Sequence, residues 1–96
     1  MKVKELLNAP SIWIKRRMAL DSQNRKCRPS DHDAKRFCLI GAIQKCYAHI
    51  DKRPIYSKII NCLNLGFQSP VTDITSWNDQ MASFEKVEKL VTKLNI

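Results

Sequence analysis

The sequence predicts an α+β fold, mainly α, in which a central buried helix is packed by two or three further helices and a small basic β-hairpin lies near the N-terminus. Three observations predict this fold class. Residues 37–43 run for seven positions without a charge, so every face of two helical turns is apolar. Residues 84–94 repeat apolar side chains every three or four positions, which is typical of an amphipathic helix. Residues 15–17 and 25–28 are rich in Lys and Arg and flank the turn-forming segment 21–24.

The N-terminal third is expected to hold a short helix and an extended segment. Residues 2–8 can form the helix, which Pro10 ends. The apolar pattern of residues 12–20 fits either a second helix or a strand. We predict a strand, because a helix would scatter the three basic residues at 15–17 around its circumference.

A four-residue loop at 21–24 is predicted to join this strand to a second one, with Asn24 at positive φ. In that hairpin Leu20 pairs with Arg25. Alternation of side chains then sorts the ribbon of residues 12–28 into an apolar face against the helices and a basic face. The basic face, the candidate anion-binding site, consists of Lys15, Arg17, Lys26 and Arg28.

The central helix is predicted over residues 30–50. Ser30 or Asp31 can cap its N-terminus, and the apolar pattern continues at helical spacing as far as Ile50, a length that favours a helix over a buried strand. Gly41 lies inside the uncharged run, where glycine costs about 1 kcal/mol relative to alanine. Close packing of a neighbouring helix or a Trp ring against this glycine explains its presence better than a hinge does.

The C-terminal half is predicted to contain two helices joined by a loop. Pro54 suits the first turn of a helix over residues 54–65. Residues 67–76 are rich in Pro, Ser and Thr, which predicts the connecting loop. Ser83 can cap the last helix, residues 83–95, whose Glu and Lys positions agree with the helix dipole.

Six residues are expected to stabilise the fold rather than to react. A Trp between a polar loop and a capped helix anchors that loop in the core, and the Asn and Asp that follow it can bond backbone groups. We expect Arg36 to pair with Asp79, and the thiol of Cys38 to be a core group. The six are Arg36, Cys38, Gly41, Trp77, Asn78 and Asp79.

These residues carry a resemblance to a known family. A Trp-containing segment, a helix with the motif A-x-R-[FW]-C-x-x-G-A-[IL] and a W-N-D loop before the last helix resemble an uncharacterised family of small bacterial and phage proteins, a domain of unknown function. The matching residues are Trp13, Ala34, Arg36, Phe37, Cys38, Gly41, Ala42, Ile43, Trp77, Asn78, Asp79 and Val87. The resemblance implies a shared fold over nearly the whole chain. It implies no activity, because none is established for that family.

Length and composition limit the class of protein. The chain has 96 residues, is 44% hydrophobic and contains only two glycines, which predicts a single compact domain over residues 1–96 rather than a disordered or collagen-like chain. No run approaches the ~18 apolar residues of a membrane span, and the charges among the first five residues disfavour a secretion signal. We therefore expect a cytoplasmic protein, with delivery into a host cell as the alternative, and reduced thiols rather than disulfides.

Positive charge is concentrated in one half of the chain. Residues 1–58 carry fourteen Lys and Arg against five Asp and Glu, whereas residues 59–96 carry three against four. A basic ribbon can follow a phosphate backbone or meet an acidic surface. We expect a non-enzymatic binding module whose partner is nucleic acid or an acidic protein surface. The alternative is that these charges only keep an edge ribbon soluble.

Catalytic and metal sites receive little support. Cys38 and His49 are eleven residues apart, which is roughly 16 Å along one helix and too far for a hydrogen bond. Cys46 and His49 would need a third ligand from a distant cysteine, at no known ligand spacing. Two isolated glycines cannot form a phosphate-binding loop. We therefore expect no catalytic residue, no metal and no cofactor.

Two other functions stay open at this point. A protein-binding regulator or host-directed bacterial effector would use an apolar patch around Ile12, Trp13 and Tyr56. A small enzyme would need a cleft near Arg36, His49 and Asp79. A structure separates these alternatives, because each requires a different surface feature.

Overall fold

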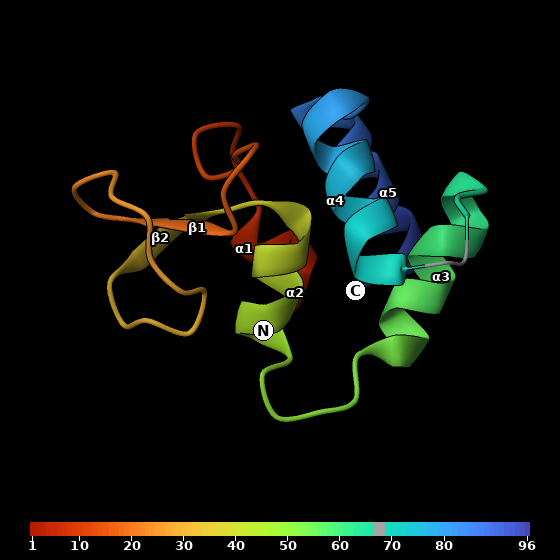
Figure 1. The fold of residues 1–96 in the computed structure, drawn as a ribbon, viewed down its shortest axis with the longest axis horizontal. Coiled ribbons are helices and arrows are strands. Elements are labelled where there is room, and N and C mark those ends of the chain that lie inside the picture. Colours follow the sequence, from red (N-terminus) through yellow and green to blue (C-terminus); the bar gives the residue numbers. More distant parts are fainter. Residues whose placement is uncertain (67–68) are drawn as a thin grey trace.

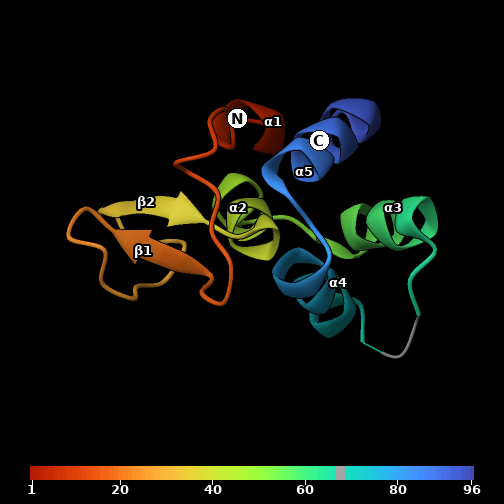
Figure 2. The same ribbon diagram turned by 90° about the horizontal axis from the view of Figure 1, so that it is seen from above.

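The uncharged run of residues 37–43 lies at the centre of the molecule. The computed structural model describes residues 1–66 and 69–96, and all seven residues of the run are buried in it. Helix α2 contacts α1, α4 and β2. Figures 1 and 2 show α2 between the small sheet on one side and α3, α4 and α5 on the other. The described elements are α1 (Val3–Leu6), β1 (Ala19–Asp21), β2 (Ala34–Phe37), α2 (Leu39–Cys46), α3 (Arg53–Leu63), α4 (Pro70–Gln80) and α5 (Phe84–Leu94).

This architecture confirms the predicted fold class. The chain is α+β and mainly helical, with one antiparallel pair of strands in the described ranges. The short N-terminal helix and the helices predicted at 54–65 and 83–95 are present as α1, α3 and α5, each somewhat shorter than expected. Among residues 1–66 and 69–96, none of the helices has the length and apolar character needed to span a membrane.

The central helix is much shorter than predicted. Residues 30–33 are turns and bends, and Ala34–Phe37 form β2, so α2 begins only at Leu39 and ends at Cys46. Its N-cap is Cys38, whose Sγ accepts a hydrogen bond from the backbone N–H of Gly41 at 3.3 Å. The prediction of a helix over 30–50 was wrong because the chain up to Phe37 is extended and pairs with β1 and with the N-terminal segment, contacts that periodicity does not reveal.

The N-terminal segment pairs with β2 and decides where that strand ends. The N–H of Phe37 donates to the carbonyl of Ile12 at 2.8 Å, and the N–H of Ile14 donates to the carbonyl of Phe37 at 3.0 Å. The chain then bends over residues 15–18, with Arg16 at φ 70°, before it enters β1. The predicted strand over residues 12–20 is therefore two short extended pieces separated by a bend.

The turn at 21–24 is present, with its register shifted by one residue, but the predicted second strand is wrong: it is reduced to an isolated bridge at Lys26, and β1 pairs with β2 instead. Asn24 has φ 61°, as predicted, and the N–H of Asp21 donates to the carbonyl of Arg25 at 2.9 Å. Leu20 therefore lies opposite Lys26 rather than Arg25. The cause is the carboxylate of Asp21, which accepts the N–H groups of Gln23 and Arg25 and closes a three-residue loop.

The predicted loop at 67–76 is mostly a helix. Its residues 67 and 68 lie outside the described residues, but α4 begins at Pro70 and contacts both α2 and α3. Proline at the first position is compatible with a helix start, and Ile74 and Trp77 bury one side of it. The prediction failed because two apolar residues among Ser, Thr and Asp make a weak stripe, and the tertiary contacts overrode composition.

Gly41 is needed because backbone lies directly against it. A Cβ built at this position would overlap the carbonyl oxygen of Met18. That same oxygen accepts the N–H of Cys38 at 3.2 Å, so it cannot move away without breaking a hydrogen bond. The predicted close packing is thus present, although the neighbour is the bend before β1 rather than a helix or a Trp ring.

We expect Gly41→Ala to destabilise the protein by about 3 kcal/mol, because overpacking against fixed backbone costs more than crowding a side chain. Gly66→Ala is the matched control, since its Cβ would meet only Asp73 Oδ2 at 3.7 Å. Urea unfolding of both variants measures the difference. Equal stability of the two variants would contradict the role assigned to Gly41.

Candidate functional site

A buried amide joins three distant segments of the chain. Asn78 on α4 is fully buried, and its Oδ1 accepts hydrogen bonds from Trp13 Nε1 at 2.7 Å and from the N–H of Leu39 at 3.1 Å. Its Nδ2 donates to the carbonyl of Ile14 at 3.1 Å and to Asp79 Oδ1 at 3.0 Å. All four hydrogen-bonding positions of the amide are therefore filled. Asn78 fastens the N-terminal segment and the start of α2 to α4.

Asp79 continues this network to the bend before β1. Its Oδ1 also accepts the N–H of Arg16 at 2.9 Å, which holds Arg16 in the left-handed conformation that non-glycine residues rarely adopt. The expected Arg36–Asp79 pair is wrong, because no salt bridge among the described residues joins them and Asp79 bonds backbone and amide groups instead. Arg36 lies opposite Leu20 in the sheet.

The four cysteine thiols differ in burial. Cys38 is buried, and burial raises the pKa of its thiol, so the thiolate is disfavoured. Burial also raises the pKa of Cys27 and Cys46. No three His, Cys, Asp or Glu side chains in the described part of the chain are grouped closely enough to hold a metal ion. Cys62 is exposed on α3.

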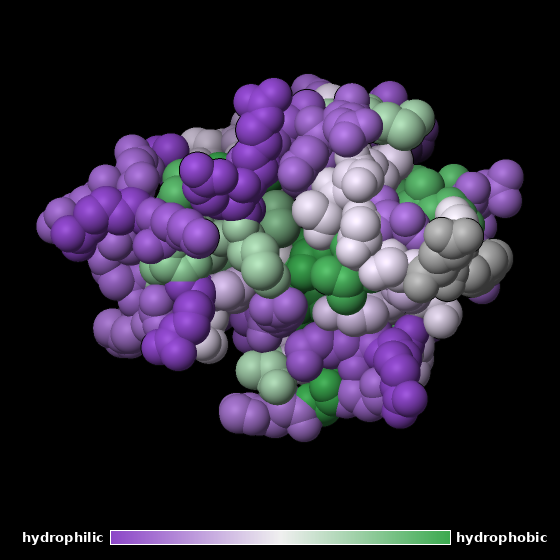
Figure 3. Space-filling view, viewed as in Figure 1, coloured by the Kyte–Doolittle hydropathy of each residue, from purple (hydrophilic) through white to green (hydrophobic). Residues whose placement is uncertain are grey.

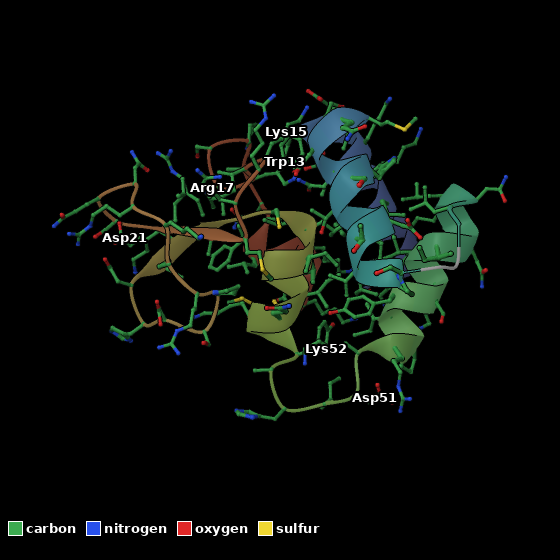
Figure 4. The ribbon with its side chains drawn as sticks, viewed as in Figure 1. Trp13, Lys15, Arg17, Asp21, Asp51 and Lys52 are labelled. Carbon is green, nitrogen blue, oxygen red and sulfur yellow. The ribbon has the colours of Figure 1, made fainter. Side chains whose placement is uncertain are left out.

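The four candidate anion-binding residues are all exposed, on different parts of the surface. Lys15 Nζ lies 5.6 Å from the centre of the Trp13 ring, and Figure 4 shows Lys15 and Arg17 projecting on the side of the molecule away from Lys52. Lys26 lies opposite Leu20. Arg28 contacts Asp31 through a salt bridge of 3.3 Å.

A cleft of about 670 Å³ separates the end of the hairpin from α2 and α3. Figure 3 shows it as the notch at the lower edge of the molecule. Arg28, Lys52 and Arg53 line it, together with apolar atoms of Met18, Ile50 and Tyr56. The acidic side chain in the lining, Asp51, pairs with Arg53 at 2.9 Å, and hydrogen bonds from Arg53 lower its pKa to about 2. We name this feature the basic cleft.

Sequence analysis missed the basic cleft because its two walls are far apart in the chain. Residues 28–30 of one wall belong to the segment that connects β1 to β2. Residues 50–56 of the other wall belong to the end of the α2–α3 connection and the first turn of α3. The charged run Asp51-Lys52-Arg53 is the one local signal for this cleft in the sequence. The residues that neighbour Arg28 in the sequence do not indicate that Arg28 lines the same cleft as Lys52 and Arg53.

The structure also locates the residues named for the two alternative functions. Tyr56 is buried, and Ile12 and Trp13 are half-buried, with the Trp13 ring N–H bonded to Asn78. They do not form an exposed apolar patch. Arg36, His49 and Asp79, the residues named for a small enzyme, line neither the basic cleft nor the three hollows formed mainly by α3, α4 and α5.

Replacement of Asn78 by Leu is expected to cost about 3 kcal/mol or more of folding free energy, because it leaves buried donors and acceptors without partners. Asn61→Leu, at an exposed position on α3, is the control and is expected to change stability by less than about 0.5 kcal/mol. Urea unfolding followed by circular dichroism measures both. A mild effect at Asn78 would show that the network is dispensable.

Alkylation of the native protein is expected to follow burial. Iodoacetamide should modify the exposed Cys62 first and Cys38 last, because the Cys38 thiol is buried and its pKa is raised. Peptide mapping by mass spectrometry at successive times gives the order, with the urea-unfolded protein as the reference in which all four react. Early modification of Cys38 would reopen a catalytic function for this thiol.

Comparison with known proteins places the chain in a family of unknown function. No curated protein and no solved structure matches the chain. Residues 1–94 match a protein family described as "Family of unknown function (DUF6197)". The match includes every residue of the Asn78 network and the whole of α5. The chain belongs to this family of unknown function.

Proposed function

We propose that this protein is a non-enzymatic binding module that docks nucleic acid on the basic surface of its N-terminal half. The observation that carries the proposal is that the acidic side chains of this half already form salt bridges or hydrogen bonds. Asp21, Asp31 and Asp51 form salt bridges with Arg25, Arg28 and Arg53, as local pairs within four residues of each other. The remaining cations of this half are therefore in excess over the acids that could neutralise them.

The other two acids of this half are also engaged. Asp33 accepts hydrogen bonds from the backbone N–H and the hydroxyl of Ser22, and the hydroxyl bond lowers its pKa. Glu5 accepts the N–H of Lys2 at 2.8 Å. Lys15, Arg17 and Lys26 form no salt bridge within the described ranges. These three cations of the predicted basic face are therefore available to an external anion.

The placement of the cations favours a long anion over a compact one. Lys26 and Arg36 flank Leu20 from its two neighbouring strands, so the three side chains lie in a row on one face. Lys15 and Arg17 lie before β1, and Arg28 reaches the basic cleft. A phosphate backbone can follow separated charges of this kind, whereas a single small anion would contact one or two of them.

The same charges would also suit an acidic protein surface. Nucleic acid is favoured because the exposed cations are spread over short strands and bends. A specific protein interface typically has an apolar centre around which its polar groups are arranged. Binding to acidic protein in place of nucleic acid is one of the outcomes that the experiment below detects.

Fluorescence anisotropy with a labelled DNA duplex across a salt series tests the proposal. Four to six phosphate contacts predict a slope of log K against log salt of about −4 to −5. The variant Lys15→Gln/Arg17→Gln/Lys26→Gln is expected to weaken binding about tenfold or more and to flatten the slope by roughly 2 to 3.

The matched control removes the same charge elsewhere. Lys86→Gln/Lys89→Gln/Lys93→Gln, on α5, should weaken binding less than about threefold, because these lysines act only at a distance in screened solvent. Absent binding, salt-independent binding or equal losses in the two variants would overturn the proposal. A parallel titration with polyglutamate identifies a partner that is acidic protein instead.

A further inference from the structure

We propose that the groove between α3 and α5 is a second docking site, which takes an acidic peptide segment with apolar side chains. Figure 2 shows α3 and α5 as neighbours on the side of the molecule away from the sheet, and the two helices contact each other. The groove is separate from the basic surface proposed above for nucleic acid, and its residues come from α3, α4 and α5. We name it the lysine groove.

The lysine groove has an apolar floor and basic walls. Its volume is about 280 Å³, which is at or below the lower end for sites that enclose a drug-sized ligand, roughly 300 to 1,000 Å³. This space suits one or two aliphatic side chains of a larger partner. Its lining consists of Cys62, Leu63, Trp77, Lys86, Lys89, Leu90 and Lys93.

The charges around the groove all have one sign. Lys86, Lys89 and Lys93 follow one another at helical spacing along α5 and cover about 10 Å at 1.5 Å per residue. No acidic residue is part of the lining. Lys86 Nζ donates to the carbonyl of Met81 at 3.2 Å, which holds it at the end of α4. Lys89 and Lys93 form no salt bridge in the described part of the chain.

The acids of α5 lie on the neighbouring face. Glu85 and Glu88 line a shallow hollow with Lys89, Thr92 and Lys93, so the two lysines stand on the ridge between the hollow and the groove. A partner with carboxylates is therefore attracted on the groove side, whereas in the hollow the two Glu offset the two Lys. This asymmetry fixes the side from which an acidic segment approaches.

The combination of floor and walls favours a peptide over other anions. A phosphate backbone would use the lysines but would leave the apolar floor unused. A membrane surface would need apolar side chains that protrude, whereas Trp77 is only 7% exposed and its ring is recessed. A short amphipathic segment supplies both the apolar anchors and the carboxylates, which is how helices dock in apolar grooves.

Two synthetic peptides test the proposal. One has Leu at positions i, i+4 and i+7 with Glu at the flanking positions, and the other has Lys in place of each Glu. Anisotropy of the labelled peptides is expected to show binding of the acidic peptide at least about tenfold tighter than the basic one. Bound acidic peptide should also slow alkylation of Cys62, which lines the groove, several-fold while Cys27 is unaffected.

Variants locate the site. Lys86→Gln/Lys89→Gln/Lys93→Gln is expected to weaken the acidic peptide about tenfold, and Lys89→Glu/Lys93→Glu should reverse the preference between the peptides. Lys15→Gln/Arg17→Gln/Lys26→Gln, the variant that tests nucleic acid binding, should leave peptide affinity within about twofold. No binding up to about 1 mM, equal binding of both peptides, or an unprotected Cys62 would overturn the proposal.

Discussion

The buried amide of Asn78 is the constraint on which the rest of the structure depends. Its two atoms satisfy the ring N–H of Trp13, the first N–H of α2 and the carbonyl of Ile14, groups that would otherwise be buried without partners. Asn78 is the one polar side chain among the fully buried groups of the described chain. The amide is satisfied only when three segments meet in this arrangement: residues 13–14, the start of α2, and α4. The network therefore selects one packing of an otherwise apolar core.

The position of the basic hairpin follows from that network. Asp79 holds Arg16 in a left-handed bend, and the bend presents the carbonyl of Met18 to Cys38 and Gly41. The strand β1 leaves this point at a defined angle, because Gly41 has no side chain to push it away. Residues outside the exposed basic surface, such as Asp79 and Gly41, thus decide where the exposed cations lie. Backbone contacts thus position the small sheet and the exposed loops that it carries.

The two proposed surfaces differ in how charge meets apolar area. The N-terminal half has excess cations on strands and bends, with its acids already paired. The lysine groove has three cations around a recessed apolar floor. Cations without adjacent apolar area suit nucleic acid, which is bound through its phosphate backbone. Cations around an apolar recess suit a peptide segment, which supplies carboxylates and apolar side chains. The two proposals therefore name partners of different chemistry for the two surfaces.

The sequence alone determined the burial of residues 37–43, the amphipathic α5, the turn at Asn24 and the uneven distribution of charge, because each depends on neighbours within a few positions. It also pointed to Asn78 as a structural residue, without its partners. Tertiary structure alone decided that α2 begins after Cys38 and that residues 70–80 are helical. It also decided that Asp79 bonds Arg16 rather than Arg36, and that Arg28 faces the start of α3. These outcomes depend on hydrogen bonds and packing between residues as far as 65 positions apart, and local periodicity carries no information about such distant partners.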